Sequence, residues 1–322
     1  MSYLKDHLRE VQAAAARIAP HVRRTPLLGT DLAPNLRLKP ECFQVTGSFK
    51  PRGAFNAILQ LAQDAATKGV IAVSSGNHAQ AVALAARVAG LPAVVLIPED
   101  ANPAKVAATR ALGAEVIQEG ITFANREQRV QQEMAERGLT LVHPFDDWDV
   151  IHGQGTVAKE VLEDDGQVEV VVTPVGGGGL LAGTALVVKA SRPRARVVGV
   201  EPEAANDAYL TLTTGRLHTL PAAPTTLADG VRTVSVGRRN FEVLVEKGLA
   251  DAIVTVTEEE IKQGLRTAWT RLHLALEPTG ALPLAAYLAG KLPDGAVTGL
   301  ILSGGNAGLE LVSRLLREGS AA

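Results

Sequence analysis

Residues 168–183, VEVVVTPVGGGGLLAG, contain the pattern that decides the fold. A β-branched run over 168–172 is followed by a glycine-rich turn and then by an apolar segment that starts at Leu180. A strand, a tight turn and a helix in this order are typical of one unit of a parallel sheet. Gly176–Gly179 lack Cβ atoms, so their backbone N–H groups can turn toward one anion at the helix start. The stretch therefore predicts a phosphate site beyond a strand end.

Short apolar runs alternate with helical stretches on both sides of this segment. We expect strands at 70–73, 93–97, 115–117, 140–142, 168–172, 197–200, 252–256 and 297–302. Runs of this kind indicate parallel strands covered by helices on both faces. The sequence therefore predicts an α/β protein of two three-layer open-sheet units with mainly parallel strands. We expect a large domain formed by residues 1–59 with 148–322, and a small domain formed by 60–147.

Two further loops follow predicted strands. They are Ser74-Ser75-Gly76-Asn77-His78 and Ser303-Gly304-Gly305-Asn306. Open parallel sheets bind ligands beyond the carboxyl ends of their strands, so these loops are candidate binding sites. The hydroxyls, amide and helical N–H groups of the first loop suit a carboxylate or phenolate oxygen. Taken alone, each loop is better explained as a turn with a helix cap.

Lys50 lies in a fourth segment, Thr46-Gly47-Ser48-Phe49-Lys50-Pro51-Arg52-Gly53, at a predicted helix start. The positive end of the helix dipole disfavours the ammonium form of such a lysine. A neutral amine is what a Schiff-base lysine requires. A rival interpretation is a nicotinamide-dependent oxidoreductase, because Gly177, Gly179 and Ala182 satisfy G-x-G-x-x-A and Glu201 follows the next strand. That interpretation leaves Lys50 and two of the three loops unused.

Composition excludes several other classes. The chain carries 32 basic and 34 acidic side chains, a net charge of −2, which gives no field for a nucleic acid. The uncharged run 171–188 contains Pro174 and four consecutive glycines, so we expect no membrane span or membrane partner. Cys42 is the only cysteine, and Lys5 and Asp6 stand where a signal peptide would be apolar. These features predict a cytoplasmic protein.

The ordered set of motifs resembles the threonine dehydratase and serine racemase family. These are pyridoxal-phosphate (PLP) enzymes of fold type II, like the tryptophan synthase β subunit. The resemblance runs from Arg24-Thr25-Pro26-Leu27 to Asn306. Between them it includes the four segments above, Gly153-Gln154-Gly155-Thr156, Leu227-Ala228-Asp229-Gly230-Val231 and Glu277-Pro278-Thr279-Gly280-Ala281. Each motif is weak alone, and the ordered set is specific.

The resemblance implies roles for the cofactor residues. Lys50 would hold PLP as a Schiff base and serve as the catalytic base, while Gly176, Gly177, Gly178 and Gly179 would hold its phosphate. Asn77 would bind the 3′ oxygen, Phe49 would pack against the ring, and Ser303 would face the pyridine nitrogen. A hydroxyl cannot fully protonate that nitrogen, so the ring is a weaker electron sink and β-elimination is favoured over transamination.

The resemblance also implies a substrate site and a cation site. The residues expected to contact the substrate are Ser74, Ser75, Gly76, His78, Arg126 and Phe145. Ser75 also matches the second acid–base residue of the racemases, so it does not separate the two activities. The Glu201 carboxylate, the Ala205 carbonyl and the Asp207 carboxylate match the family's divalent-cation spacing, and oxygen ligands suit Mg²⁺ or Ca²⁺.

The resemblance implies a dehydratase that converts L-threonine into 2-oxobutanoate and ammonia, and L-serine into pyruvate. Phe145 favours this function, because eukaryotic serine racemase has Asn there and an apolar ring accommodates the threonine methyl. Serine racemase with dehydratase side activity and hydroxyaspartate dehydratase remain alternatives. The partners expected are an amino-acid substrate and further copies of the chain, as a homodimer or homotetramer. His152 replaces a usually small residue, and the sequence does not explain it.

Overall fold

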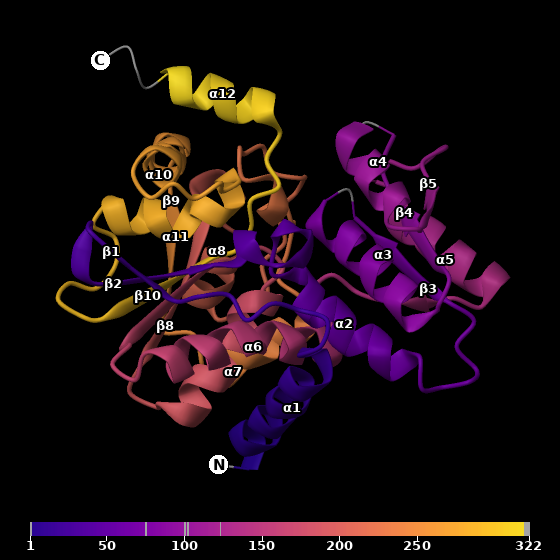
Figure 1. Cartoon of the computed structure of the whole chain (residues 1–322), viewed down its shortest axis with the longest axis horizontal. Helices are drawn as coiled ribbons and strands as arrows, with labels where there is room; N and C mark the ends of the chain where they lie inside the picture. The colour runs from indigo at the N-terminus through magenta and orange to yellow at the C-terminus, as the bar shows by residue number, and fades with distance from the viewer. Residues whose placement is uncertain (1, 75, 100, 102, 123, 319–322) are drawn as a thin grey trace.

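The computed structural model of the chain describes residues 2–74, 76–99, 101, 103–122 and 124–318 (Figure 1). The larger of its two sheets has six strands in the order β1-β2-β10-β7-β8-β9. The strands are β1 (Leu28–Thr30), β2 (Ala33–Pro40), β7 (Val170–Pro174), β8 (Arg196–Pro202), β9 (Ala252–Val256) and β10 (Thr298–Leu302). All neighbours pair in parallel except β1 and β2, which are antiparallel at one edge.

The smaller sheet has four parallel strands in the order β5-β4-β3-β6. They are β3 (Val70–Val73), β4 (Ala93–Leu96), β5 (Glu115–Ile117) and β6 (Thr140–Leu141). The helices are α1 (Ser2–Ile18), α2 (Lys50–Leu61), α3 (Asn77–Ala89), α4 (Pro103–Ala111), α5 (Arg126–Arg137), α6 (Trp148–Asp164), α7 (Gly179–Ser191), α8 (Asp207–Thr214), α9 (Arg238–Phe241), α10 (Glu258–Thr270), α11 (Pro278–Leu288) and α12 (Leu309–Glu318).

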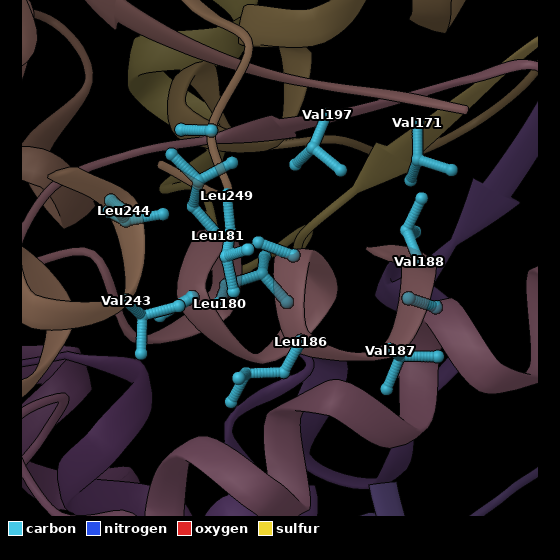
Figure 2. Packing of buried hydrophobic residues seen from close by; sticks show 14 of the residues in the cluster. Val171, Leu180, Leu181, Leu186, Val187, Val188, Val197, Val243, Leu244 and Leu249 are labelled. Atoms are coloured by element: carbon cyan, nitrogen blue, oxygen red, sulfur yellow. The ribbon is translucent and has the colours of Figure 1, made fainter. Parts of the chain in front are cut away.

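Helices cover both faces of the large sheet. Val171 of β7 packs with side chains of α6 and α7, whereas its neighbours Val170 and Val172 pack with α10 and α11. Figure 2 shows Val171 and Val197 facing the leucines and valines of α7. Because both faces of the strand are buried, β7 is an unbroken apolar run rather than an alternating one.

Helices also cover both faces of the small sheet. Val70 and Ala72 pack in a cluster with residues of α2 and α3, while Ile71 packs with Val130 of α5 on the opposite face. In Figure 1 these elements lie beside the large sheet. The predicted α/β fold with mainly parallel sheets is confirmed. The domain boundaries near residues 60 and 147 stay a prediction.

The strand predictions were accurate inside the chain and incomplete at its start. Strands 70–73, 115–117 and 252–256 have the predicted bounds, whereas β7 lies two residues later than expected at each end. The strands β1 and β2 were not predicted. Among the described residues, no helix combines the length and the apolar composition that crossing a bilayer requires.

Candidate active site

The predicted loops meet at the carboxyl ends of β7, β10 and β3. Ser48 forms an antiparallel bridge with Gly304, and the Phe49 N–H donates to the Ser303 carbonyl over 3.0 Å. The lysine segment and the loop after β10 therefore run side by side. Ser303 is buried, and the buried Ser48 hydroxyl has no hydrogen-bond partner among the described residues.

Lys50 is the first residue of α2, as the sequence predicted. Its Nζ donates to the Pro144 carbonyl over 2.7 Å and lies 5.1 Å from the centre of the Phe49 ring. Loss of solvent around the amine lowers the pKa of Lys50 from 10.5 to about 8. In the structure, desolvation lowers the pKa of Lys50, whereas the sequence analysis attributed a lowered pKa to the helix dipole. Near neutral pH a usable fraction of the amine is unprotonated, as covalent attachment to an aldehyde requires.

This pKa predicts how cofactor attachment depends on pH. Only the neutral amine is a nucleophile, so the attachment rate of PLP to apoenzyme should increase as pH rises through 8. We expect roughly a tenfold increase between pH 7 and pH 9 and a plateau above it. The cofactor phosphate ionises near pH 6, outside this window. Stopped-flow absorbance measures the rate, and a rate independent of pH would contradict the assignment.

A buried ionic cluster fixes the start of α2. Arg52 is fully buried and donates to both carboxylate oxygens of Glu41 and of Glu160, at 2.7 to 2.9 Å. Lys39 of β2 also pairs with Glu160, at 2.7 Å. A buried guanidinium needs such partners, because leaving it unpaired costs several kcal/mol. The cluster joins β2, α2 and α6 two residues away from Lys50.

The glycine loop has the shape of an anion site. It connects β7 to α7, whose first-turn N–H groups have no carbonyl partners within the helix. Gly178 has φ +95°, which favours glycine, and a Cβ on Gly177 would lie 2.3 Å from the Phe145 ring. The loop can therefore only be built from residues without side chains. This cradle fits a phosphate group.

Asn77 is held by two side chains from distant parts of the chain. Its Nδ2 donates to Glu277 Oε1 over 2.7 Å, and Asn306 Nδ2 donates to Asn77 Oδ1 over 2.7 Å. One Nδ2 hydrogen of Asn77 is left for another acceptor. Burial, reinforced by Asp229, raises the pKa of Glu277 to about 7. Sequence reasoning assigned no role to Glu277, although its position just before Pro278 at the start of α11 marked it.

The loop after β3 is only partly described. Ser74 Oγ accepts from the Gly76 N–H over 3.2 Å, and Ser75 lies outside the described residues. His78 Nε2 lies 2.8 Å from the Val142 carbonyl, so we assign it as the donor; Nδ1 has no partner in the part of the chain that the structure describes. Burial lowers the pKa of His78 to about 3, which keeps the ring neutral.

The last two substrate residues lie in different settings. Arg126 is the first residue of α5, and loss of solvent lowers its pKa. The Phe145 ring lies against the glycine loop and edge-on to His143, with ring centres 4.6 Å apart. The substrate contacts expected of both residues stay predictions.

The three residues predicted to bind a cation lie at the end of β8, which contains Glu201, and in the turn after it, which contains Ala205 and leads to Asp207. Glu201 and Asp207 are fully buried, and Ala205 is nearly so. Both Asp207 carboxylate oxygens lack a hydrogen-bond partner among the residues described. Burial raises the pKa of Glu201 to about 9 and that of Asp207 to about 7. No group of three or more His, Cys, Asp or Glu side chains placed for a metal occurs in the described chain. The Glu201 and Asp207 carboxylates and the Ala205 carbonyl nevertheless fit a hard cation, since both Asp207 oxygens are buried and lack a partner among the described residues.

The structure places a lysine of lowered pKa and a glycine-rich turn beyond the carboxyl ends of parallel strands, as in an enzyme of the α/β class. The family model described as pyridoxal-phosphate dependent enzyme matches residues 18–304. The chain belongs to this family, and it is a PLP-dependent lyase.

Three relatives show how the family divides by activity. A crystal structure of a threonine deaminase from T.th. is 49% identical with a TM-score of 0.88, over 94% of this chain and 98% of that one. An L-threo-3-hydroxyaspartate ammonia-lyase of Saccharomyces cerevisiae is 41% identical, over 95% of both chains. A serine racemase of Dictyostelium discoideum is 39% identical, over 96% of this chain and 97% of the relative.

Proposed function

We propose that the protein is a deaminating dehydratase of hydroxy amino acids with L-threonine as its preferred substrate. The net reaction converts L-threonine into 2-oxobutanoate and ammonia, and L-serine into pyruvate and ammonia. The observation that carries the proposal is the Lys50 amine, with its pKa of about 8. It lies next to Phe49, whose N–H donates to the Ser303 carbonyl, and it donates to Pro144, which precedes the Phe145 ring on the glycine loop. Phe145, in contact with that loop, supplies an apolar wall.

Each residue has a defined task in this proposal. Bound PLP supplies the electron sink that stabilises negative charge at the substrate Cα. Lys50 Nζ removes the Cα proton, and the Pro144 carbonyl orients that nitrogen. Gly176–Gly179 hold the cofactor phosphate, and the Asn77 amide binds its 3′ oxygen. The Ser303 hydroxyl faces the pyridine nitrogen without protonating it, which favours release of the β-hydroxyl.

The substrate carboxylate would be bound at the start of α3. The first N–H groups of α3, from Asn77 onward, have no acceptor within the helix, and a helix N-terminus stabilises an anion. Arg126 is the charged residue proposed to assist, and Phe49 packs beside Lys50. Ser75 keeps its predicted role as the acid–base residue opposite Lys50.

A substrate panel tests the proposal. L-Threonine, L-serine and L-threo-3-hydroxyaspartate are assayed for ammonia and oxo acid, and L-serine also for D-serine. We expect kcat/KM for threonine to exceed that for serine about tenfold, since one methyl in an apolar pocket contributes about 1–3 kcal/mol. D-Serine forming faster than 2-oxobutanoate would favour the racemase, and fastest turnover of the aspartate derivative would favour the third activity.

We also propose a divalent cation at Glu201, Ala205 and Asp207. Mg²⁺ or Ca²⁺ would ligate the unpaired carboxylate of Asp207, and its positive charge would favour the ionised forms of Glu201 and Asp207 over the neutral forms that burial favours. Adding either ion to EDTA-treated protein should raise the melting temperature by at least about 2 °C. Asp207→Asn should abolish this response, whereas Glu203→Gln, in the same loop but exposed, should keep it. If the melting temperature of the EDTA-treated wild type did not change on addition of either ion, the proposed cation site would be contradicted.

A further inference from the structure

Asn240 connects two segments of the site that lie far apart in sequence. It is fully buried in the short helix α9. Its Nδ2 donates to the Gly177 carbonyl over 2.7 Å and to the Phe145 carbonyl over 3.0 Å. Both hydrogens of this amide are therefore used, one on the glycine loop and one on the segment that leads into α6.

The Gly177 carbonyl is held in place by two donors. Besides the Asn240 amide, the Gly237 N–H donates to it over 3.0 Å. A carbonyl oxygen carries partial negative charge and would repel a phosphate if it turned into the cradle. Fixing this oxygen in hydrogen bonds to α9 leaves the N–H groups of the loop available for the anion.

The contact between α9 and the Phe145 segment is reinforced nearby. The Asp146 carboxylate accepts from the backbone N–H groups of Arg238, at 3.1 Å, and Arg239, at 2.8 Å. A Cβ on Gly178 would lie 2.9 Å from the Asn240 Cβ, so the loop packs directly on this side chain. The same segment provides the Pro144 carbonyl that accepts from Lys50. Asn240 thus joins the phosphate cradle to the Phe145 backbone, while the contact between Lys50 and Pro144 does not involve its amide.

We propose that Asn240 is a positioning residue for the phosphate end of the cofactor. It acts through the Gly177 carbonyl and touches no reacting atom. The inference rests on the proposed role of Gly176–Gly179 as the phosphate cradle. The proposal predicts that removing the Asn240 amide weakens binding of the cofactor phosphate. Covalent attachment of the aldehyde to Lys50 should be almost unaffected.

The test compares PLP with pyridoxal, which lacks the phosphate. Asn240→Leu keeps the side-chain size and removes both donors. For the apoenzyme variant we expect the Kd for PLP to rise at least about tenfold and the Kd for pyridoxal to change less than about threefold. Asn56→Leu is the matched control, because Asn56 is also buried and its amide donates to a carbonyl away from the loop. This control should not discriminate between the two ligands.

One result would overturn the role of Asn240, and another would overturn the phosphate cradle on which it rests. A Kd for PLP that stays unchanged, or that shifts by the same factor as that for pyridoxal, overturns the role of Asn240. If Asn240→Leu does not fold, Asn240→Ala is measured in the same way, with thermal unfolding as the check on folding. A wild type that binds pyridoxal as tightly as PLP overturns the phosphate cradle itself, and the Asn240 variants are not needed to see it.

Discussion

Replacing Lys50 by alanine should lower 2-oxo acid formation about 100- to 10,000-fold, the range that loss of a general base produces. The variant loses the amine that attacks the cofactor aldehyde and the base that removes the Cα proton. No other amine is expected to replace it, because Lys50 Nζ is the amine positioned beside Phe49 and the Pro144 carbonyl. The assay is 2-oxobutanoate formation from L-threonine.

A surface lysine provides the control for this variant. Lys262 pairs with Glu259 on α10, away from the loops of the site. Lys262→Ala should therefore keep wild-type turnover. Unfolding of Lys50→Ala is checked by its melting temperature. If folded Lys50→Ala kept more than a tenth of the wild-type rate, another group would be the base.

Gly177→Ala should weaken cofactor binding by roughly five- to 150-fold. A Cβ at this position would lie 2.3 to 2.4 Å from three atoms of the Phe145 ring, so the ring or the loop must move. Strain of this kind costs about 1–3 kcal/mol, which corresponds to roughly five- to 150-fold in Kd. The measurement is a titration of apoenzyme with PLP.

Two further variants isolate the cause. Gly29→Ala is the control, because a Cβ on Gly29 meets no atom within 4 Å and its φ is not positive. Adding Phe145→Ala to Gly177→Ala should recover part of the lost affinity, since the clashing ring is gone. If Gly177→Ala had the same Kd for PLP as the wild type, the glycine loop would not be tightly packed against the Phe145 ring.

The sequence identified the loops proposed to bind the cofactor because each follows a buried parallel strand. The carboxyl ends of such strands meet at one edge, so loops distant in sequence are expected to converge. The contact between Asn77 and Asn306, 229 residues apart, is an example of this convergence. Local patterning was sufficient for Gly176–Gly179 and for Lys50 at the start of α2.

The sequence could not reveal the contacts that depend on tertiary packing. The Pro144 carbonyl lies 94 residues from Lys50 and belongs to no motif that faces a lysine. Strand β2 was missed because it contains two prolines and charged side chains. Lys39 is buried there with the Glu160 carboxylate and the Thr25 carbonyl as partners. Asn240 lies in a four-residue helix without periodic pattern. These features require knowledge of which elements pack together.

The most direct test of the central claim is to identify the lysine that holds the cofactor. Protein saturated with PLP is reduced with borohydride, digested with a protease and analysed by mass spectrometry. We expect the phosphopyridoxyl group on the peptide that contains Lys50, at close to one group per chain. An unmodified Lys50, or a label carried by a different lysine, would contradict the account.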